Sequence, residues 1–123
     1  MGWKVENDGL GVVFSRDIPT LTRNEFKRVA SEFLQSHELT HKDVDHFACH
    51  PGGAKVLEAL EEAFNLSYGS LITSRDVLHD YGNMSAVTVL FVLERLLAQN
   101  QHGRFLLSSL GPGFTAAFQT MNV

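Results

Sequence analysis

The sequence predicts an α/β fold, with a mixed β-sheet, packed helices and one buried central helix, formed by a single domain of residues 1–123. Two observations lead to this prediction. Short β-prone segments alternate along the chain with segments whose apolar residues recur at helical spacing. The 123 residues, 44% of them hydrophobic and 20% charged, suffice for one hydrophobic core but not for two.

The first elements are a hairpin and a helix. Residues 3–6 and 10–14 are β-prone and flank the turn sequence NDG at 7–9, which tolerates positive φ, so we expect two paired strands. Thr22 and Glu25 form the signature of a capping box, and a helix is therefore predicted to begin at Thr22. Its apolar stripe consists of Phe26, Val29, Ala30, Phe33 and Leu34.

The middle of the chain predicts a strand followed directly by a helix. Residues 44–49 are expected to form a short buried strand, because they are β-prone and stop at a turn rich in proline and glycine. An amphipathic helix is predicted over residues 54–64. Residues 74–79 are expected to form one or two helical turns, which Gly82 would end in a left-handed conformation.

The last third of the sequence predicts the central helix and two strands. Asn83 is a candidate N-cap for a helix over residues 84–98, which is apolar around most of its circumference. Strands are predicted at residues 104–109 and 114–121, on either side of the turn sequence GPG at 111–113.

Composition excludes several functional classes. Ten Lys and Arg against fourteen Asp and Glu give a formal charge of −4, which argues against nucleic-acid binding and against a basic membrane-surface helix. The longest apolar run, residues 86–93, is far shorter than the ~20 residues that span a bilayer. Because the single cysteine, Cys49, cannot form an internal disulfide and no leader is recognisable, we expect a cytoplasmic protein.

Histidines are frequent, but their spacing does not predict a metal site. Five possible ligands fall within fourteen positions: His37, His41, His46, Cys49 and His50. Neither a second cysteine nor an HExxH pattern accompanies them, so solvated loop histidines are the favoured interpretation. Cys49 beside His50 could also be a thiolate with its base, as in a small thiol hydrolase. Strand alternation places neighbouring side chains on opposite faces and favours a buried, inert cysteine.

The sequence HPGG at 50–53 is more specific, because it places an imidazole at the carboxyl end of a strand, before a turn and a helix N-terminus. Ligands collect in that position in α/β folds, and helix N-terminal N–H groups suit an anion. Lys55 adds a positive charge nearby, although no Walker pattern is present. A glycine turn needed only for packing is the alternative. Asn83 is either a simple cap or a carboxamide aimed at a ligand.

Three motifs in this order resemble the type III polyketide synthases, the chalcone synthase-like family: FACHPGG at 47–53, DYGNMS at 80–85 and LGPGF at 110–114. The resemblance covers nearly the whole chain but only the C-terminal half of such an enzyme. It implies half of a thiolase-like fold, in which two similar α/β halves pack as five layers and the enzyme is a homodimer. It also implies that the nucleophilic cysteine belongs to an N-terminal half that this chain lacks.

The resemblance further implies an acyltransferase that condenses an acyl-CoA starter with malonyl-CoA by a decarboxylative Claisen reaction. His50 and Asn83 would be catalytic and would form an oxyanion hole. Coenzyme A thioesters would be the substrates, with no permanently bound cofactor. By the same resemblance, coenzyme A or substrate would contact Gly52, Gly53, Lys55, Ser85, Gly111, Pro112 and Gly113. The pocket would be lined by Trp3, Val12 and Phe14, and Ser109 and Leu110 replace the Gly-Phe that opens the family's glycine loop.

A second hypothesis is a non-catalytic domain that binds an acyl-CoA or assembles with a partner chain. Half of a layered fold exposes apolar surface that the other half would cover, and exposed patches of this kind mark interaction sites. Under either hypothesis, we expect the isolated 123-residue chain to be inactive as a synthase.

Overall fold

A computed structural model describes residues 2–13, 16–111 and 115–123. The described strands are β1 (Gly2–Glu6), β2 (Gly9–Val13), β3 (His46–Cys49), β4 (Arg104–Gly111) and β5 (Thr115–Asn122). The helices are α1 (Ile18–Leu21), α2 (Lys27–Ser36), α3 (Ala54–Ala63), α4 (Ile72–Tyr81) and α5 (Thr88–Ala98). Three further helical segments are the π-helical η1 (Thr22–Phe26) and the 3-10 segments η2 (His41–Asp43) and η3 (Ser85–Val87).

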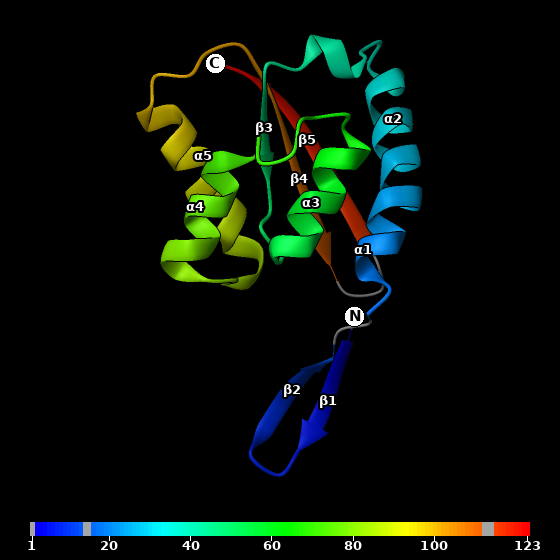
Figure 1. The fold of residues 1–123 in the computed structure, drawn as a ribbon, viewed down its shortest axis with the longest axis vertical. Helices are drawn as coiled ribbons and strands as arrows, with labels where there is room; N and C mark the ends of the chain where they lie inside the picture. The colour runs from blue at the N-terminus through cyan, green and yellow to red at the C-terminus, as the bar shows by residue number, and fades with distance from the viewer. Residues whose placement is uncertain (1, 14–15, 112–114) are drawn as a thin grey trace.

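A mixed three-stranded sheet forms the middle layer, in the order β3-β4-β5. β3 runs parallel to β4, with Cys49 opposite Ser108, and β4 runs antiparallel to β5. Figure 1 shows α2 and α3 to one side of this sheet and α4 and α5 to the other. The predicted α/β class and mixed sheet are therefore confirmed.

Each face of the sheet has its own core. On the α2 and α3 side, Phe26, Phe64 and Leu57 pack with Leu106 of β4, and the Phe26 and Phe64 rings meet edge to face at 5.5 Å. The other core contains Ala48, Val77, Val92, Leu96 and Phe105. Alternating residues of β3 and β4 contribute to opposite cores, as expected of a sheet covered on both faces.

The first helical region begins earlier than the capping signature predicted. The backbone is already helical at Ile18, and Thr22 lies inside a helical segment, so it is not an N-cap. Pro19 is tolerated because it lies in the first turn, where backbone N–H groups have no helical acceptor. The capping box lies elsewhere, at η2, where the Thr40 N–H donates to Asp43 Oδ2 at 2.7 Å.

The expected central helix is shorter and less covered than predicted. α5 begins at Thr88 rather than at residue 84, because a 3-10 turn precedes it. One side of α5, with Val92 and Leu96, is buried against the sheet, whereas Leu90 is 55% exposed. The helix was predicted to be buried between two layers. Within the described residues, only the side of α5 that faces the sheet is buried.

The hairpin of β1 and β2 is present as predicted and projects away from the sheet and helices (Figure 1). Trp3 pairs with Val12 and Val5 with Leu10, so these four side chains share one face of the ribbon. Their exposed fractions are 61%, 49%, 82% and 67%, respectively. The opposite face carries the charged Lys4 and Glu6, with glycines and Val13, and we call it the polar face. We call the face of Trp3, Val5, Leu10 and Val12 the apolar hairpin face.

A buried ion pair ties α3 to α4. Glu61 is 1% exposed and accepts hydrogen bonds from the Arg75 guanidinium at 2.9 Å and from the N–H groups of Gly69 and Leu71 at 2.9 and 3.1 Å. Burial by itself raises the pKa of Glu61, but the hydrogen bonds from Gly69, Arg75 and Leu71 outweigh it and lower the pKa below its usual value.

Glu61→Gln is expected to lower the free energy of unfolding at pH 7 by about 3 kcal/mol, because it leaves the Arg75 charge poorly compensated. A carboxyl with a lowered folded-state pKa stabilises the fold above its unfolded pKa of about 4.3 and loses that contribution as pH falls through the folded value. The penalty should therefore shrink in acid. Urea unfolding between pH 3 and 7 measures both effects.

The matched control is Glu62→Gln, because Glu62 is exposed and pairs with Arg23 at the surface. Surface pairs are worth about 0 to 1 kcal/mol. Equal destabilisation by the two substitutions would contradict a special role for Glu61.

Candidate functional site

His50 and Asn83 meet at the carboxyl end of β3, beside a cavity of about 60 Å³. β3 ends at Cys49 and α3 begins at Ala54, so a four-residue turn delivers the imidazole to the cavity. The cavity is lined by Ile18, Phe26, His50, Gly52, Val56, Leu60, Asn83, Ser108, Ser109 and Leu110. The sequence-predicted pair is thus brought together by the fold.

His50 is positioned by the sheet. Its backbone N–H donates to the Ser108 carbonyl at 2.9 Å, which extends the β3–β4 pairing by one residue. The side chain is 9% exposed, and its Nδ1 has no hydrogen-bond partner in the part of the chain that the structure describes. Gly52 has no Cβ atom, but one placed there would lie 3.9 Å from His50 Nε2. The Nε2 edge of the imidazole ring therefore faces Gly52. Burial lowers the pKa of His50, which favours a neutral imidazole at pH 7.

Asn83 is held by the turn that follows α4. Gly82 ends that helix with φ +71°, a conformation that glycine adopts at little cost. The Ser85 N–H donates to Asn83 Oδ1 at 2.9 Å, and Asn83 Nδ2 donates to the Gly52 carbonyl at 3.3 Å. The sequence predicted Asn83 as a candidate N-cap of the long helix, and the structure shows that it is not. Its carboxamide instead closes a local turn and points its amide nitrogen at Gly52.

The two side chains offer nitrogen donors to one small region. Asn83 Nδ2 carries a second hydrogen that has no acceptor among the described residues. His50 Nε2 adds another donor whenever it carries the ring proton. Phe26, Val56 and Leu60 supply apolar walls beside the buried His50, whereas Asn83 is solvent-exposed in this domain. Hydrogen bonds to a developing negative charge are stronger where apolar walls exclude water. Two N–H donors directed at one region can in general stabilise a negatively charged oxygen.

Cys49 has the environment of a structural thiol. It is 0% exposed and packs in the core beside Leu57 and Leu106. Burial raises the pKa of the Cys49 thiol to about 12, so almost no nucleophilic thiolate exists at neutral pH. The prediction that Cys49 is buried is confirmed, and this burial argues against the alternative of a thiol hydrolase.

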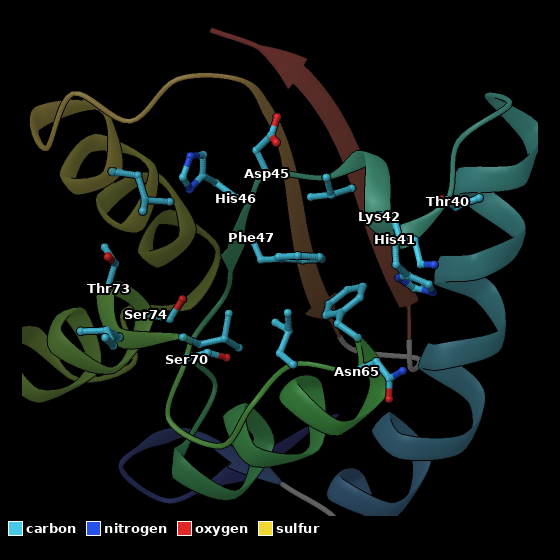
Figure 2. Close-up of a pocket in the computed structure, with 16 residues that line it drawn as sticks. Thr40, His41, Lys42, Asp45, His46, Phe47, Asn65, Ser70, Thr73 and Ser74 are labelled. Carbon is cyan, nitrogen blue, oxygen red and sulfur yellow. The ribbon is translucent and has the colours of Figure 1, made fainter.

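The other histidines of the 37–50 cluster are engaged individually, and two of them, His41 and His46, border a second cavity of about 810 Å³ (Figure 2). His41 Nε2 lies 3.2 Å from Ser31 Oγ, and His46 Nε2 lies 3.1 Å from the His102 carbonyl oxygen. Across residues 2–13, 16–111 and 115–123, no three His, Cys, Asp or Glu side chains are grouped as metal ligands.

Comparison with known proteins now decides the family. The sequence profile described as "Chalcone and stilbene synthases, C-terminal domain" matches residues 1–121. The chain belongs to this family. It is 41% identical over 120 residues to a putative chalcone synthase of Bacillus subtilis and 36% identical over 121 residues to 1,3,6,8-tetrahydroxynaphthalene synthase of Streptomyces peucetius.

These alignments cover 94% and 96% of this chain but only 33% and 32% of the two relatives, so the chain spans about one third of their length. The crystal structure of 1,3,6,8-tetrahydroxynaphthalene synthase from Streptomyces coelicolor, a bacterial type III polyketide synthase, superposes with a TM-score of 0.87 at 25% identity. That match covers 97% of this chain and 35% of the synthase. The chain is thus a type III polyketide synthase C-terminal domain.

Other residues singled out from the synthase resemblance lie around the site rather than in its wall. Gly53 precedes α3, and Lys55 is exposed in the first turn of that helix. Ser85 contributes its backbone N–H to Asn83. Gly111 follows the cavity residue Leu110 in β4.

Two predicted pocket residues, Trp3 and Val12, lie on the hairpin and do not line the cavity. Phe14, Pro112 and Gly113 lie outside the described residues. Contacts of all these residues with substrate remain predictions.

Several cavity residues were missed by sequence reasoning. Ile18 and Phe26 come from the first helical region, Val56 and Leu60 from α3, and Ser108 from β4. The helical spacing of Phe26, Val56 and Leu60 predicted that these side chains are buried. Periodicity does not tell which buried side chains border a cavity, because that depends on packing between distant elements.

None of the helices in the described part of the domain has the length and apolar character that a membrane span requires.

His50 is expected to titrate below the ordinary histidine pKa of about 6.5, since burial penalises its charged form. Between the folded and unfolded values only the unfolded state binds the proton, so the free energy of unfolding should fall as pH drops below about 6.5. Nitrogen-15 NMR of the ring measures the first effect, and urea unfolding at pH 5 to 8 measures the second. His50→Gln should remove this part of the pH dependence. A His50 midpoint at or above the unfolded value would contradict the assignment.

Proposed function

We propose that this domain is the C-terminal catalytic half of an acyltransferase that condenses an acyl-CoA starter with malonyl-CoA. The supporting observation is the convergence of His50 Nε2 and Asn83 Nδ2 on Gly52 at the end of β3. A thioester carbonyl oxygen placed between these nitrogens would accept hydrogen bonds from both. No permanently bound cofactor is needed for this chemistry.

In the proposed step, malonyl-CoA loses carbon dioxide, and the electron pair of the broken carbon–carbon bond moves into an enolate. His50 and Asn83 stabilise the enolate oxygen, and each donor of this kind contributes ~3 kcal/mol to the transition state. The enolate carbon then attacks the carbonyl carbon of an acyl thioester, so that a carbon–carbon bond forms, the carbon–sulfur bond breaks and the carrier sulfur leaves as a thiolate. The acyl group is carried by a cysteine outside this chain, whose thiolate His50 would also stabilise. Cys49 takes no part, since it is buried.

The size of the cavity supports a shared active site. About 60 Å³ is well below the ~300 to 1,000 Å³ of small-molecule pockets, so this domain would supply one wall of the substrate site. The chain also spans only about one third of its relatives. We place the coenzyme A arm near Gly52, Gly53 and the exposed Lys55, whose charge suits a phosphate. The complete enzyme is proposed to be a cytoplasmic homodimer.

A chimaera tests the catalytic assignment. This chain would replace the matching third of the Bacillus relative, and decarboxylation of malonyl-CoA and condensation with an acyl-CoA would be measured. Asn83→Ala and His50→Ala are each expected to reduce decarboxylation about 10²-fold to 10³-fold, because each removes one oxyanion donor. Asn24→Ala, at an exposed position of η1 away from the cavity, is the matched control.

Full decarboxylation in both site variants would contradict the oxyanion role. A folded chimaera that decarboxylates no malonyl-CoA even with His50 and Asn83 intact would contradict the proposed function itself.

The apolar hairpin face favours one part of the second hypothesis, namely that the domain assembles with a partner chain. Two-stranded ribbons are marginally stable alone, and an apolar patch of a few hundred Å² usually has a binding partner. The proposed occupant is a polypeptide corresponding to the two thirds of the relatives that this chain does not match. Assembly and catalysis are compatible, because that polypeptide would also supply the nucleophilic cysteine.

Trp3 reports directly on this assembly, since it is the only tryptophan of the chain and lies on the apolar hairpin face. Adding the first two thirds of the Bacillus relative, with its own tryptophans replaced, should shift Trp3 emission to shorter wavelength as water is excluded. Val5→Lys should abolish the shift, whereas Lys4→Ser, on the polar face, should leave it unchanged. An unchanged Trp3 spectrum together with no complex on size exclusion would rule out assembly through this face.

A further inference from the structure

Thr88 connects the start of α5 to the turn that carries Asn83. Its side chain is 0% exposed, so its hydroxyl is buried. Oγ1 accepts a hydrogen bond from the Met84 N–H at 2.9 Å and donates one to the Ser85 carbonyl at 2.7 Å. One hydroxyl therefore satisfies a backbone donor and a backbone acceptor in the two residues that follow Asn83.

The turn needs this support because its backbone is strained at Ser85. Ser85 has φ +66°, a left-handed conformation that costs a residue with a Cβ roughly 1 to 2 kcal/mol. Such conformations persist where the surroundings hold them in place. Ser85 is held at both of its backbone groups: its N–H donates to Asn83 Oδ1, and its carbonyl accepts from both the hydroxyl and the backbone N–H of Thr88.

The strained turn sets the direction of the Asn83 carboxamide. Because the Ser85 N–H occupies Oδ1, the amide nitrogen is the end that reaches Gly52. If Ser85 relaxed to negative φ, its N–H would leave Oδ1 and the carboxamide could rotate. Rotation by half a turn would present an acceptor oxygen at the cavity, where a developing negative charge needs a donor.

We infer that Thr88 is a positioning residue, whose hydroxyl fixes which end of the Asn83 carboxamide faces the His50 cavity. Thr88 does not itself touch the cavity. Its action passes through two hydrogen bonds to Met84 and Ser85, and from Ser85 to Asn83. The effect on the carboxamide is a property of this chain alone, while the catalytic consequence rests on the proposed function.

Two variants separate the hydroxyl of Thr88 from its volume. Thr88→Val keeps the branched shape and removes the hydroxyl, whereas Thr88→Ser keeps the hydroxyl and removes a methyl group. In the nitrogen-15-labelled 123-residue chain, NMR relaxation of the Asn83 side-chain NH₂ reports the order of the carboxamide, and hydrogen exchange reports protection of the Met84 amide. Urea unfolding gives the global stability of each variant.

Thr88→Val is expected to disorder the Asn83 side chain and to accelerate Met84 exchange about tenfold or more, the equivalent of one lost hydrogen bond of ~1.4 kcal/mol. Thr88→Ser should resemble the parent chain. A purely structural threonine would lower stability in both variants without changing the order of Asn83. An ordered, unchanged Asn83 side chain in folded Thr88→Val overturns the inference. If Thr88→Val does not fold, Thr88→Ala serves in its place, with the same outcomes.

The chimaera supplies a separate kinetic test. Thr88→Val should lower kcat for malonyl-CoA decarboxylation about tenfold while changing KM less than about twofold, because an interaction made mainly in the transition state is weakened. Equal losses for Thr88→Ser and Thr88→Val would overturn a role for the hydroxyl. Absence of decarboxylation in the parent chimaera would reject the proposed function, and the NMR result would still decide the role of Thr88.

Discussion

The parallel pairing of β3 with β4 is the constraint on which the site depends. It sets Cys49 opposite Ser108 and continues into the hydrogen bond between the His50 N–H and the Ser108 carbonyl. His50 therefore lies beside β4, whose residues Ser108 and Leu110 also line the cavity. The same pairing directs Cys49 into the core, so one strand register sets both the burial of the thiol and the position of the His50 imidazole.

Near this strand pair, the two turns that flank α4 each form hydrogen bonds with a buried polar side chain. Glu61 accepts hydrogen bonds from backbone N–H groups of the loop before α4. The Thr88 hydroxyl forms hydrogen bonds with the backbone of the turn after α4. α4 is thus anchored at both ends by buried polar side chains, and Asn83 lies just beyond the second anchor. Low dielectric strengthens such bonds and also makes any unmade one costly, which is why these turns hold unusual backbone angles.

Local sequence patterns predicted the elements well, and predicted their starts less well. The hairpin, the strand before HPGG, α3 and the final strand pair follow from turn chemistry and apolar spacing, which act over a few residues. Two helix starts were wrong by four residues, at Thr22 and at residue 84, because capping signals compete with proline geometry at Pro19 and with the turn that Ser85 and Thr88 close. The helical turns predicted at residues 74–79 are part of a longer helix, because α4 spans Ile72–Tyr81. The meeting of His50 with Asn83 was anticipated only through the family resemblance. The cavity walls were not anticipated, since Ile18 and Phe26 reach it through tertiary packing.

The separation between the paired strands has a consequence for how the domain folds. Cys49 and Ser108 are 59 positions apart in the chain, and α3, α4 and α5 all lie between them. Closing so long a segment is entropically costly and must precede the contacts that reward it, whereas helices and the β4–β5 hairpin need only local contacts. Formation of the His50 region is accordingly coupled to a long-range strand pairing and cannot be completed by local contacts alone.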